Sequence, residues 1–264
     1  MLDGMWRATV AILVMMQASA WQAWAQTRTE RVPVLAELFT SQGCSSCPPA
    51  DRILELLARE PPVDGVDVII MSEHVTYWDH QGWRDPFGSA TFTSRQQMYG
   101  DWFKLESVFT PQLVIDGTTQ IVGTDIAGLK AALAKAAGTP KRQLVVDLRT
   151  SGSNGLVATA SGPGLVAGHE LVLAVTEDDL QVEVKRGENA RRTLRHAGVV
   201  RWFSSRKISD GSAATPAPID IPLRAEWKRD RLRVVAFVQS VRTREVISVG
   251  AVSVQAPRPR DTPR

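Results

Sequence analysis

The two cysteines of this 264-residue chain, Cys44 and Cys47, lie between an apolar run and the start of a helix. Residues 32–39 have the length and hydrophobicity of a buried strand. Pro48 and Pro49 fit the first turn of a helix, where a missing N–H costs little, and apolar residues then recur at helical spacing. The sequence therefore predicts a CxxC pair at the N-terminus of a helix, directly after a strand.

This placement predicts thiol chemistry, because the partial positive charge at a helix N-terminus stabilises a thiolate. Cys44 is then the attacking thiol and Cys47 the resolving thiol of an oxidoreductase that needs no cofactor. One alternative is a structural disulfide in a non-catalytic interaction protein, although closing so short a loop stabilises a fold by only about 2 kcal/mol. Another is a metal site, in which Cys44, Cys47 and His74 bind Cu(I) or a similar ion through soft sulfur ligands.

The first 25 residues have the pattern of a secretory signal peptide. Arg7 precedes an apolar run over residues 8–16, and Ala23-Trp24-Ala25 is a small-x-small cleavage signal. No later segment approaches the roughly 20 apolar residues of a transmembrane helix. We therefore expect an exported protein, periplasmic or secreted, without a transmembrane segment after cleavage.

Length and charge predict two domains in the mature chain. Residues 1–140 carry a net charge of −5 and residues 141–264 one of +8. The turn signal at residues 138–140 separates them. We expect an α/β domain over residues 26–140, a β-rich domain over residues 141–256, and a disordered tail over residues 257–264.

In the first domain, a second apolar run over residues 66–71 predicts a strand parallel to the first. Glu73 and His74 are then expected just past this strand, at the same sheet edge as Cys44. The rest of the domain is predicted as a helix over residues 89–103 capped by Ser89, a strand after Pro111, a turn at residues 116–117 with a returning strand, and a helix capped by Asp125.

Residues 75–87 form an aromatic loop too long for a simple connection, which is typical of a lid or a binding surface. The alternative is a satellite core of buried aromatic side chains. The side chains that we expect to bind substrate are His74, Tyr77, Trp78, Asp79, Trp83 and Thr110.

These elements together resemble a known family. The order strand, CxxC helix, strand, helix, Thr-Pro strand, strand, helix resembles the thioredoxin fold over residues 32–137. The run ELFTSQGCSSCPPAD at residues 37–51, with His74 and the segments YWD (77–79), GW (82–83), DPF (85–87) and TPQ (110–112), more closely resembles the exported, thioredoxin-like domain of unknown function 1223. The resemblance implies a disulfide-exchange site whose redox partner is a protein or a small thiol or disulfide. It also implies a cis peptide bond before Pro111 and a catalytic role for Pro111 beside the two cysteines.

Short β-rich runs separated by turns predict an antiparallel β-sandwich after residue 140. Within it, residues 193–203 are expected to form one strand, and His169 and His196 to be isolated structural histidines. Eight basic residues gather around residues 187–189: Lys185, Arg186, Arg191, Arg192, Arg195, Arg201, Arg206 and Lys207. Nucleic acid is a poor partner for an exported protein, so they indicate an anionic surface or an acidic partner protein, or otherwise a solvated hairpin.

Overall fold

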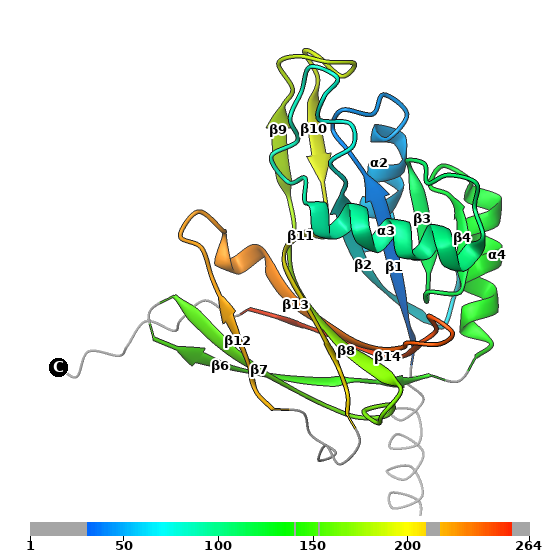
Figure 1. Ribbon diagram of the computed structural model, residues 1–264, viewed down its shortest axis with the longest axis vertical. Coiled ribbons are helices and arrows are strands. Elements are labelled where there is room, and N and C mark those ends of the chain that lie inside the picture. Colours follow the sequence, from blue (N-terminus) through cyan, green and yellow to red (C-terminus); the bar gives the residue numbers. More distant parts are fainter. Residues whose placement is uncertain (1–30, 140, 153, 210–216, 255–264) are drawn as a thin grey trace, which may run out of the picture. The chain divides into compact units, whose positions relative to one another are not determined.

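The computed structural model describes residues 31–254 except 140, 153 and 210–216. The predicted signal peptide and the predicted tail lie outside the described residues. The fold is a mixed α/β structure dominated by strands, as Figure 1 shows.

The first half of the chain has the predicted order of elements. They are β1 (Val32–Thr40), α2 (Pro48–Leu57), β2 (Val66–His74), α3 (Ala90–Phe103), β3 (Gln112–Ile115), β4 (Thr119–Val122) and α4 (Ile126–Ala137). The predicted caps are confirmed: Ser89 accepts a hydrogen bond from the Thr91 N–H, and Asp125 accepts one from the Gly128 N–H. The CxxC motif thus lies between a buried strand and a helix.

The predicted end of the second strand is wrong. β2 runs parallel to β1 through Phe39↔Glu73 and Thr40↔His74, so Glu73 and His74 belong to the strand rather than follow it. Both side chains are fully buried. A buried strand can include them because burial raises the pKa of Glu73, which favours its uncharged form, and because Asp85 hydrogen-bonds His74.

The second half adds mostly strands. They are β5 (Arg142–Gln143), β6 (Val145–Ser151), β7 (Gly155–Ser161), β8 (His169–Glu177), β9 (Leu180–Glu183), β10 (Thr193–His196), β11 (Val199–Lys207), β12 (Ile219–Pro222), β13 (Leu232–Ser240) and β14 (Val246–Ser253), with the 3₁₀ turn η1 (Arg229–Arg231) before β13. The single strand predicted over residues 193–203 is wrong. It divides at Gly198, whose φ of +62° ends β10 and begins β11.

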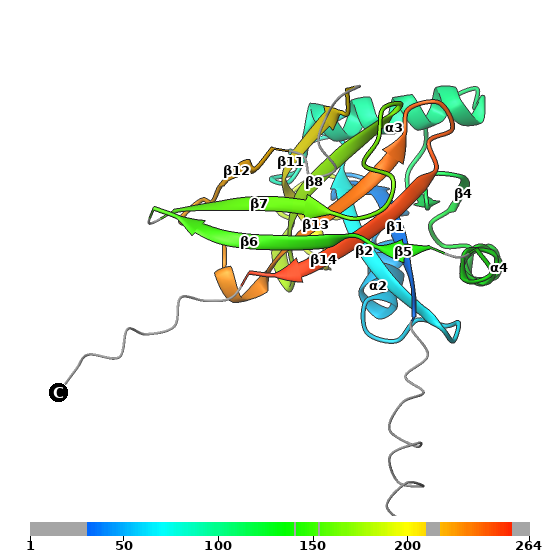
Figure 2. The ribbon, with the colours of Figure 1, turned by 90° about the horizontal axis from the view of Figure 1, so that it is seen from below.

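The two halves share one sheet. Nine strands follow the order β4-β3-β1-β2-β11-β8-β13-β14-β5, in which β11 runs parallel to β2 at Val199↔Ser72. Strands β12, β7 and β6 form a second sheet, and Figure 2 shows β6 and β7 crossing the strands of the large sheet. Apolar side chains of both sheets belong to one core cluster. The boundary near residue 140 and the sandwich stay predictions, but sheet hydrogen bonds cross the boundary.

A buried polar network also connects the two halves. Arg95 Nε donates to Glu37 at 2.6 Å, and the Tyr99 hydroxyl donates to the same carboxylate at 2.6 Å. Gln239 of β13 donates to the Tyr99 hydroxyl at 2.9 Å. Burial and the neighbouring Glu37 raise the pKa of Glu73 well above its usual value, which favours its protonated form. This network specifies how β13 lies against β1 and α3.

No helix within the described residues is long and apolar enough to cross a bilayer.

The junction between β2 and β11 gives a test of this shared sheet. A Cβ at Gly198 would lie 2.9 Å from Ile70 Cγ1 and 3.1 Å from the Ile70 carbonyl oxygen, at a positive φ. We expect Gly198→Ala to lower the free energy of unfolding by about 1–3 kcal/mol more than Gly168→Ala. Gly168 is the matched control, because its φ is +83° but nothing lies within 4 Å of its added Cβ. Equal losses in urea unfolding would contradict the close packing at this junction.

Candidate functional site

The cysteine turn is held as a disulfide, Cys44–Cys47, directly before α2. Cys47 is the N-cap residue of the helix, and its carbonyl oxygen accepts the N–H groups of Ala50 and Asp51 at 2.9 and 3.1 Å. Because Pro48 and Pro49 have no N–H, the first turn has no unpaired N–H to offer a sulfur atom. The Ser46 hydroxyl lies 3.3 Å from Cys44 Sγ.

The sequence did not predict that both cysteines would be covered. Each has an exposed fraction of 0%, although Cys44 was expected to be outermost. Part of the cover is the segment before β3, whose Thr110 carbonyl oxygen lies 3.9 Å from Cys44 Sγ. The Thr110–Pro111 peptide bond is cis, which confirms the prediction. Trp78 of the aromatic loop donates its indole N–H to Thr110 Oγ1 at 2.8 Å.

The remaining cover is the hairpin β9–β10 of the second half, which lies beside the cysteine turn in Figure 1. Asn189, fully buried, donates from Nδ2 to the carbonyl oxygens of Gln42 and Cys44 at 3.0 and 2.9 Å. The neighbouring Glu188 accepts a hydrogen bond from the Ser45 N–H at 3.0 Å. Gln42 also accepts from Trp83 Nε1 at 3.0 Å. The turn is therefore enclosed by the aromatic loop and by the hairpin.

A buried pair, His74 and Asp85, lies directly beside this turn. His74 Nδ1 is 2.7 Å from Asp85 Oδ2, and the same carboxylate accepts the N–H groups of Gln42 and Phe87 at 2.8 and 2.9 Å. Burial disfavours the imidazolium, but the Asp85 carboxylate outweighs burial and raises the pKa of His74. Burial likewise opposes ionisation of Asp85, but the charge of His74 and these hydrogen bonds lower the pKa of Asp85. Both shifts in pKa favour the ionic form of the pair.

His196 and Asp51 complete the cluster, and neither was predicted to belong to a site. The His196 ring lies 4.9 Å from the His74 ring, and its Nε2 is 3.2 Å from Gln42 Nε2. Burial and the charge of His74 lower the pKa of His196 to about 3, so it is neutral and its 3.6 Å approach to Asp51 is not an ion pair. Burial raises the pKa of Asp51 to about 7. Asp51 lies four residues after Cys47, on the same helix face.

The structure unites only part of the predicted site. The Thr110 carbonyl oxygen contacts Cys44. Trp78 hydrogen-bonds Thr110, and Trp83 hydrogen-bonds Gln42, two residues before Cys44. Tyr77 instead donates to Gln96, and Asp79 accepts the N–H of Asp85.

His74, predicted to lie near the thiols, bonds to Asp85 through Nδ1, while its Nε2 has no hydrogen-bond partner among the described residues. No described group of three or more His, Cys, Asp or Glu side chains is arranged to hold a metal ion. The copper hypothesis with Cys44 and Cys47 gains no support from this geometry.

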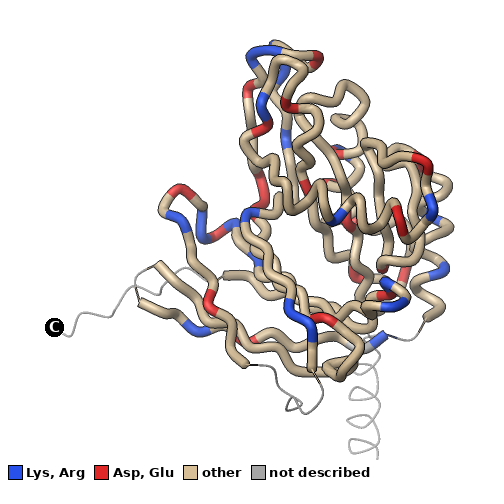
Figure 3. The backbone as a smooth tube through the Cα atoms, in the orientation of Figure 1, with Lys and Arg blue, Asp and Glu red and all other residues tan. Residues whose placement is uncertain are grey.

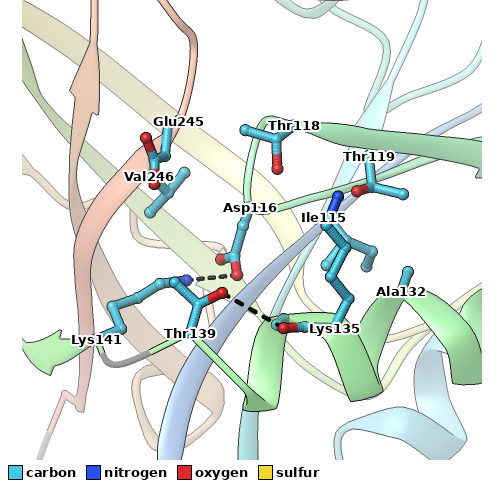
Figure 4. Close-up of a pocket in the computed structure, with 11 residues that line it drawn as sticks. Ile115, Asp116, Thr118, Thr119, Ala132, Lys135, Thr139, Lys141, Glu245 and Val246 are labelled. Carbon is cyan, nitrogen blue, oxygen red and sulfur yellow. Dashed lines mark hydrogen bonds and ion pairs between the residues drawn. The ribbon is translucent and has the colours of Figure 1, made fainter.

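A separate small pocket lies away from this site, between the β3–β4 turn, α4 and the start of β14 (Figure 4). Its volume is about 60 Å³, and Lys141 pairs there with Asp116. Asp116 also accepts the N–H of Leu35, in the first half of β1, whereas the cysteine turn follows the other end of that strand. The carboxylate and its two partners are structural, since they tie the turn to β1 and to the segment after α4.

Comparison with known proteins places this fold and site in a family. A family model described as "Protein of unknown function (DUF1223)" matches residues 35–239. The chain belongs to this family. The crystal structure of protein AGR_C_4864 from Agrobacterium tumefaciens is similar to it, with 25% identity and a TM-score of 0.63 over 88% of this chain and 99% of that chain.

A domain of the outer membrane lipoprotein Omp28 from Porphyromonas gingivalis matches at 13% identity and a TM-score of 0.22, over 44% of this chain and 92% of that chain, which is too weak to carry an argument. No curated protein matches the chain.

The buried Asp51 of this DUF1223 protein predicts a pH-dependent stability. An unfolded Asp releases its proton near pH 3.8 and the folded one near pH 7, so the folded state binds more protons in this window and stability falls as the pH rises. Asp51→Asn removes that loss, and its amide oxygen can still accept from Thr40. We expect the variant to gain stability over the wild type between pH 4 and 7, reaching at most about 4 kcal/mol.

Urea unfolding of the oxidised protein at each pH measures this gain. Asp147→Asn, at an exposed position of β6, is the control and should follow the wild type. Parallel stability curves for Asp51→Asn and the wild type would contradict the raised pKa.

Proposed function

We propose that this chain is an exported, thioredoxin-like thiol–disulfide oxidoreductase in which Cys44 and Cys47 alternate between dithiol and disulfide. One observation carries the proposal. The two cysteines pair with each other directly before a helix, and Cys44 Sγ faces the Thr110 carbonyl oxygen rather than a purely apolar core.

The exchange proceeds in two balanced steps. In the reduced protein the Cys44 thiolate attacks one sulfur of a partner disulfide, a Cys44–partner bond forms, and the other partner sulfur leaves as a thiolate that takes a proton. The Cys47 thiolate then attacks Cys44 Sγ, which releases the second partner thiolate and leaves the Cys44–Cys47 disulfide. The partner gains two electrons and two protons, and the reverse sequence oxidises a dithiol partner.

The residues around the pair support these steps in distinct ways. The Ser46 hydroxyl donates toward Cys44 Sγ and stabilises the thiolate that attacks or leaves. Asp51 is a carboxyl whose pKa of about 7 allows it to accept or release a proton near neutral pH, on the helix face that also presents Cys47. Because both cysteines are covered, a partner reaches Cys44 only when part of the cover moves.

That same burial favours a second candidate, an interaction protein in which the disulfide is only a structural constraint. A buried disulfide with no moving cover would be unreactive toward protein thiols.

Trapping of the first intermediate separates the two functions. Cys47→Ser should accumulate a mixed disulfide through Cys44 when it is mixed with a disulfide-bonded peptide, because no resolving thiol remains. Cys44→Ser is the matched control and should accumulate at least tenfold less. Mass spectrometry of the quenched mixture measures both. The absence of a mixed disulfide with Cys47→Ser would exclude the oxidoreductase.

Ser46 gives an independent test of how the thiolate is stabilised. We expect Ser46→Ala to raise the pKa of the Cys44 thiol by roughly one pH unit, since a hydrogen bond to a charged group contributes about 1.5–3 kcal/mol. Ultraviolet absorbance of the thiolate against pH measures it in the Cys47→Ser background. Ser45→Ala, between the same cysteines, is the control and should leave the titration in place. A larger shift for Ser45→Ala would contradict the assignment.

A further inference from the structure

The basic cluster seen in the sequence divides into three places in the structure. Arg201 lies 4.9 Å from the Phe87 ring and pairs with Glu177. Arg206 and Lys207 lie at the far end of β11. The other five basic residues all belong to the hairpin of residues 180–196, whose tip encloses the cysteine turn: Lys185, Arg186, Arg191, Arg192 and Arg195.

The hairpin presents its charge to solvent. All five basic residues are exposed, and none forms an ion pair with a described residue. Arg192 donates to Asn189, whereas the other four have no hydrogen bond from their side chains among the described residues. Residues 180–196 also contain Glu183 and Glu188, so the hairpin carries a net charge of +3. Figure 3 shows Lys and Arg positions in blue along the hairpin and at its tip.

The hairpin's own acidic residue shows what the cysteine turn can bind. Glu188 is exposed, yet its carboxylate accepts the Ser45 N–H, between the two cysteines, at 3.0 Å. Hydrogen bonding with the Ser45 side chain and with its N–H lowers the pKa of Glu188. The turn therefore offers an N–H donor to a carboxylate at the position where a partner must approach Cys44. A carboxylate on a partner can replace Glu188 as the acceptor of the Ser45 N–H. The hairpin tip then loses its Glu188 contact with the cysteine turn.

We infer that the hairpin of residues 180–196 is a docking arm for the redox partner, and that the partner carries an acidic polypeptide segment next to its disulfide. The inference rests on the proposed function and names the substrate class of that site. Long-range attraction to the exposed cations raises the rate of encounter, and the carboxylate that replaces Glu188 brings the partner disulfide to Cys44.

An acidic polypeptide fits the arm better than an anionic membrane surface. Stable binding at a lipid interface needs exposed apolar side chains beside the cations. The large apolar side chains that are exposed among the described residues lie elsewhere, at Leu56, Trp102, Val122, Ile126, Val145 and Val166.

The test uses two synthetic peptides, each with one internal disulfide, that differ only in flanking glutamates or flanking lysines. The reduced wild-type protein should reduce the acidic peptide at least tenfold faster than the basic peptide at low salt. About 1 M salt should bring the ratio near one, because screening then acts within about 3 Å. This salt test needs no variant.

Charge reversal locates the effect. Lys185→Glu, Arg186→Glu and Arg191→Glu together should lower the rate with the acidic peptide at least tenfold. They should leave the rate with a small uncharged linear disulfide, such as that of 2-mercaptoethanol, within twofold. The matched control reverses three exposed cations elsewhere, with Arg149→Glu, Arg206→Glu and Lys207→Glu, and should leave the acidic-peptide rate within threefold.

A cysteine-free acidic peptide distinguishes a failure of docking from a failure of exchange. Fluorescence anisotropy should show that it binds the wild type at least tenfold more tightly than the hairpin variant. If no disulfide is reduced but this binding is present, the proposed function is wrong and the docking arm remains. Equal rates and equal binding for the acidic and basic peptides would overturn the docking arm. The docking arm would also be overturned if the protein bound anionic lipid vesicles but did not prefer the acidic peptide to the basic one.

Discussion

The buried His74–Asp85 pair is the interaction on which the candidate site depends. The Asp85 carboxylate hydrogen-bonds three segments. They are the end of β2 at His74, the cysteine turn at Gln42, and the aromatic loop at Phe87. Removing one member of such a pair leaves an uncompensated buried charge, which is far more costly than an exposed pair is stabilising. The position of the disulfide is thus specified by polar contacts behind it, while the hairpin and the aromatic loop cover it.

Local patterns in the sequence predicted the elements that carry the cysteines. The apolar run of residues 32–39, the two prolines after Cys47 and the caps at Ser89 and Asp125 are features of neighbouring residues, and the structure has a strand or helix at each. The cis peptide bond between Thr110 and Pro111 was instead predicted from the resemblance to a known family. Helix and strand signals are local, so a single sequence reveals them.

The surroundings of the disulfide could not be predicted in this way. Asn189 and His196 are about 150 residues distant from the turn that they contact, and a polar residue in a predicted hairpin gives no sign of its partner. The extension of β2 to His74 was missed because charged residues argue against a buried strand until their partners are known. Asp51 was not singled out in the sequence, yet it is buried. These misses around the disulfide all involve buried polar side chains whose neighbours come from other segments of the chain.

The reduction potential of the Cys44–Cys47 pair tests the central claim most directly. Equilibration of the protein in glutathione buffers of defined ratio, followed by alkylation and mass spectrometry, measures it. Oxidoreductases of thiol–disulfide exchange have potentials between about −120 and −270 mV, and we expect a reversible equilibrium within that range. A potential below about −300 mV, or a pair that does not equilibrate, is typical of a structural disulfide and would contradict the claim.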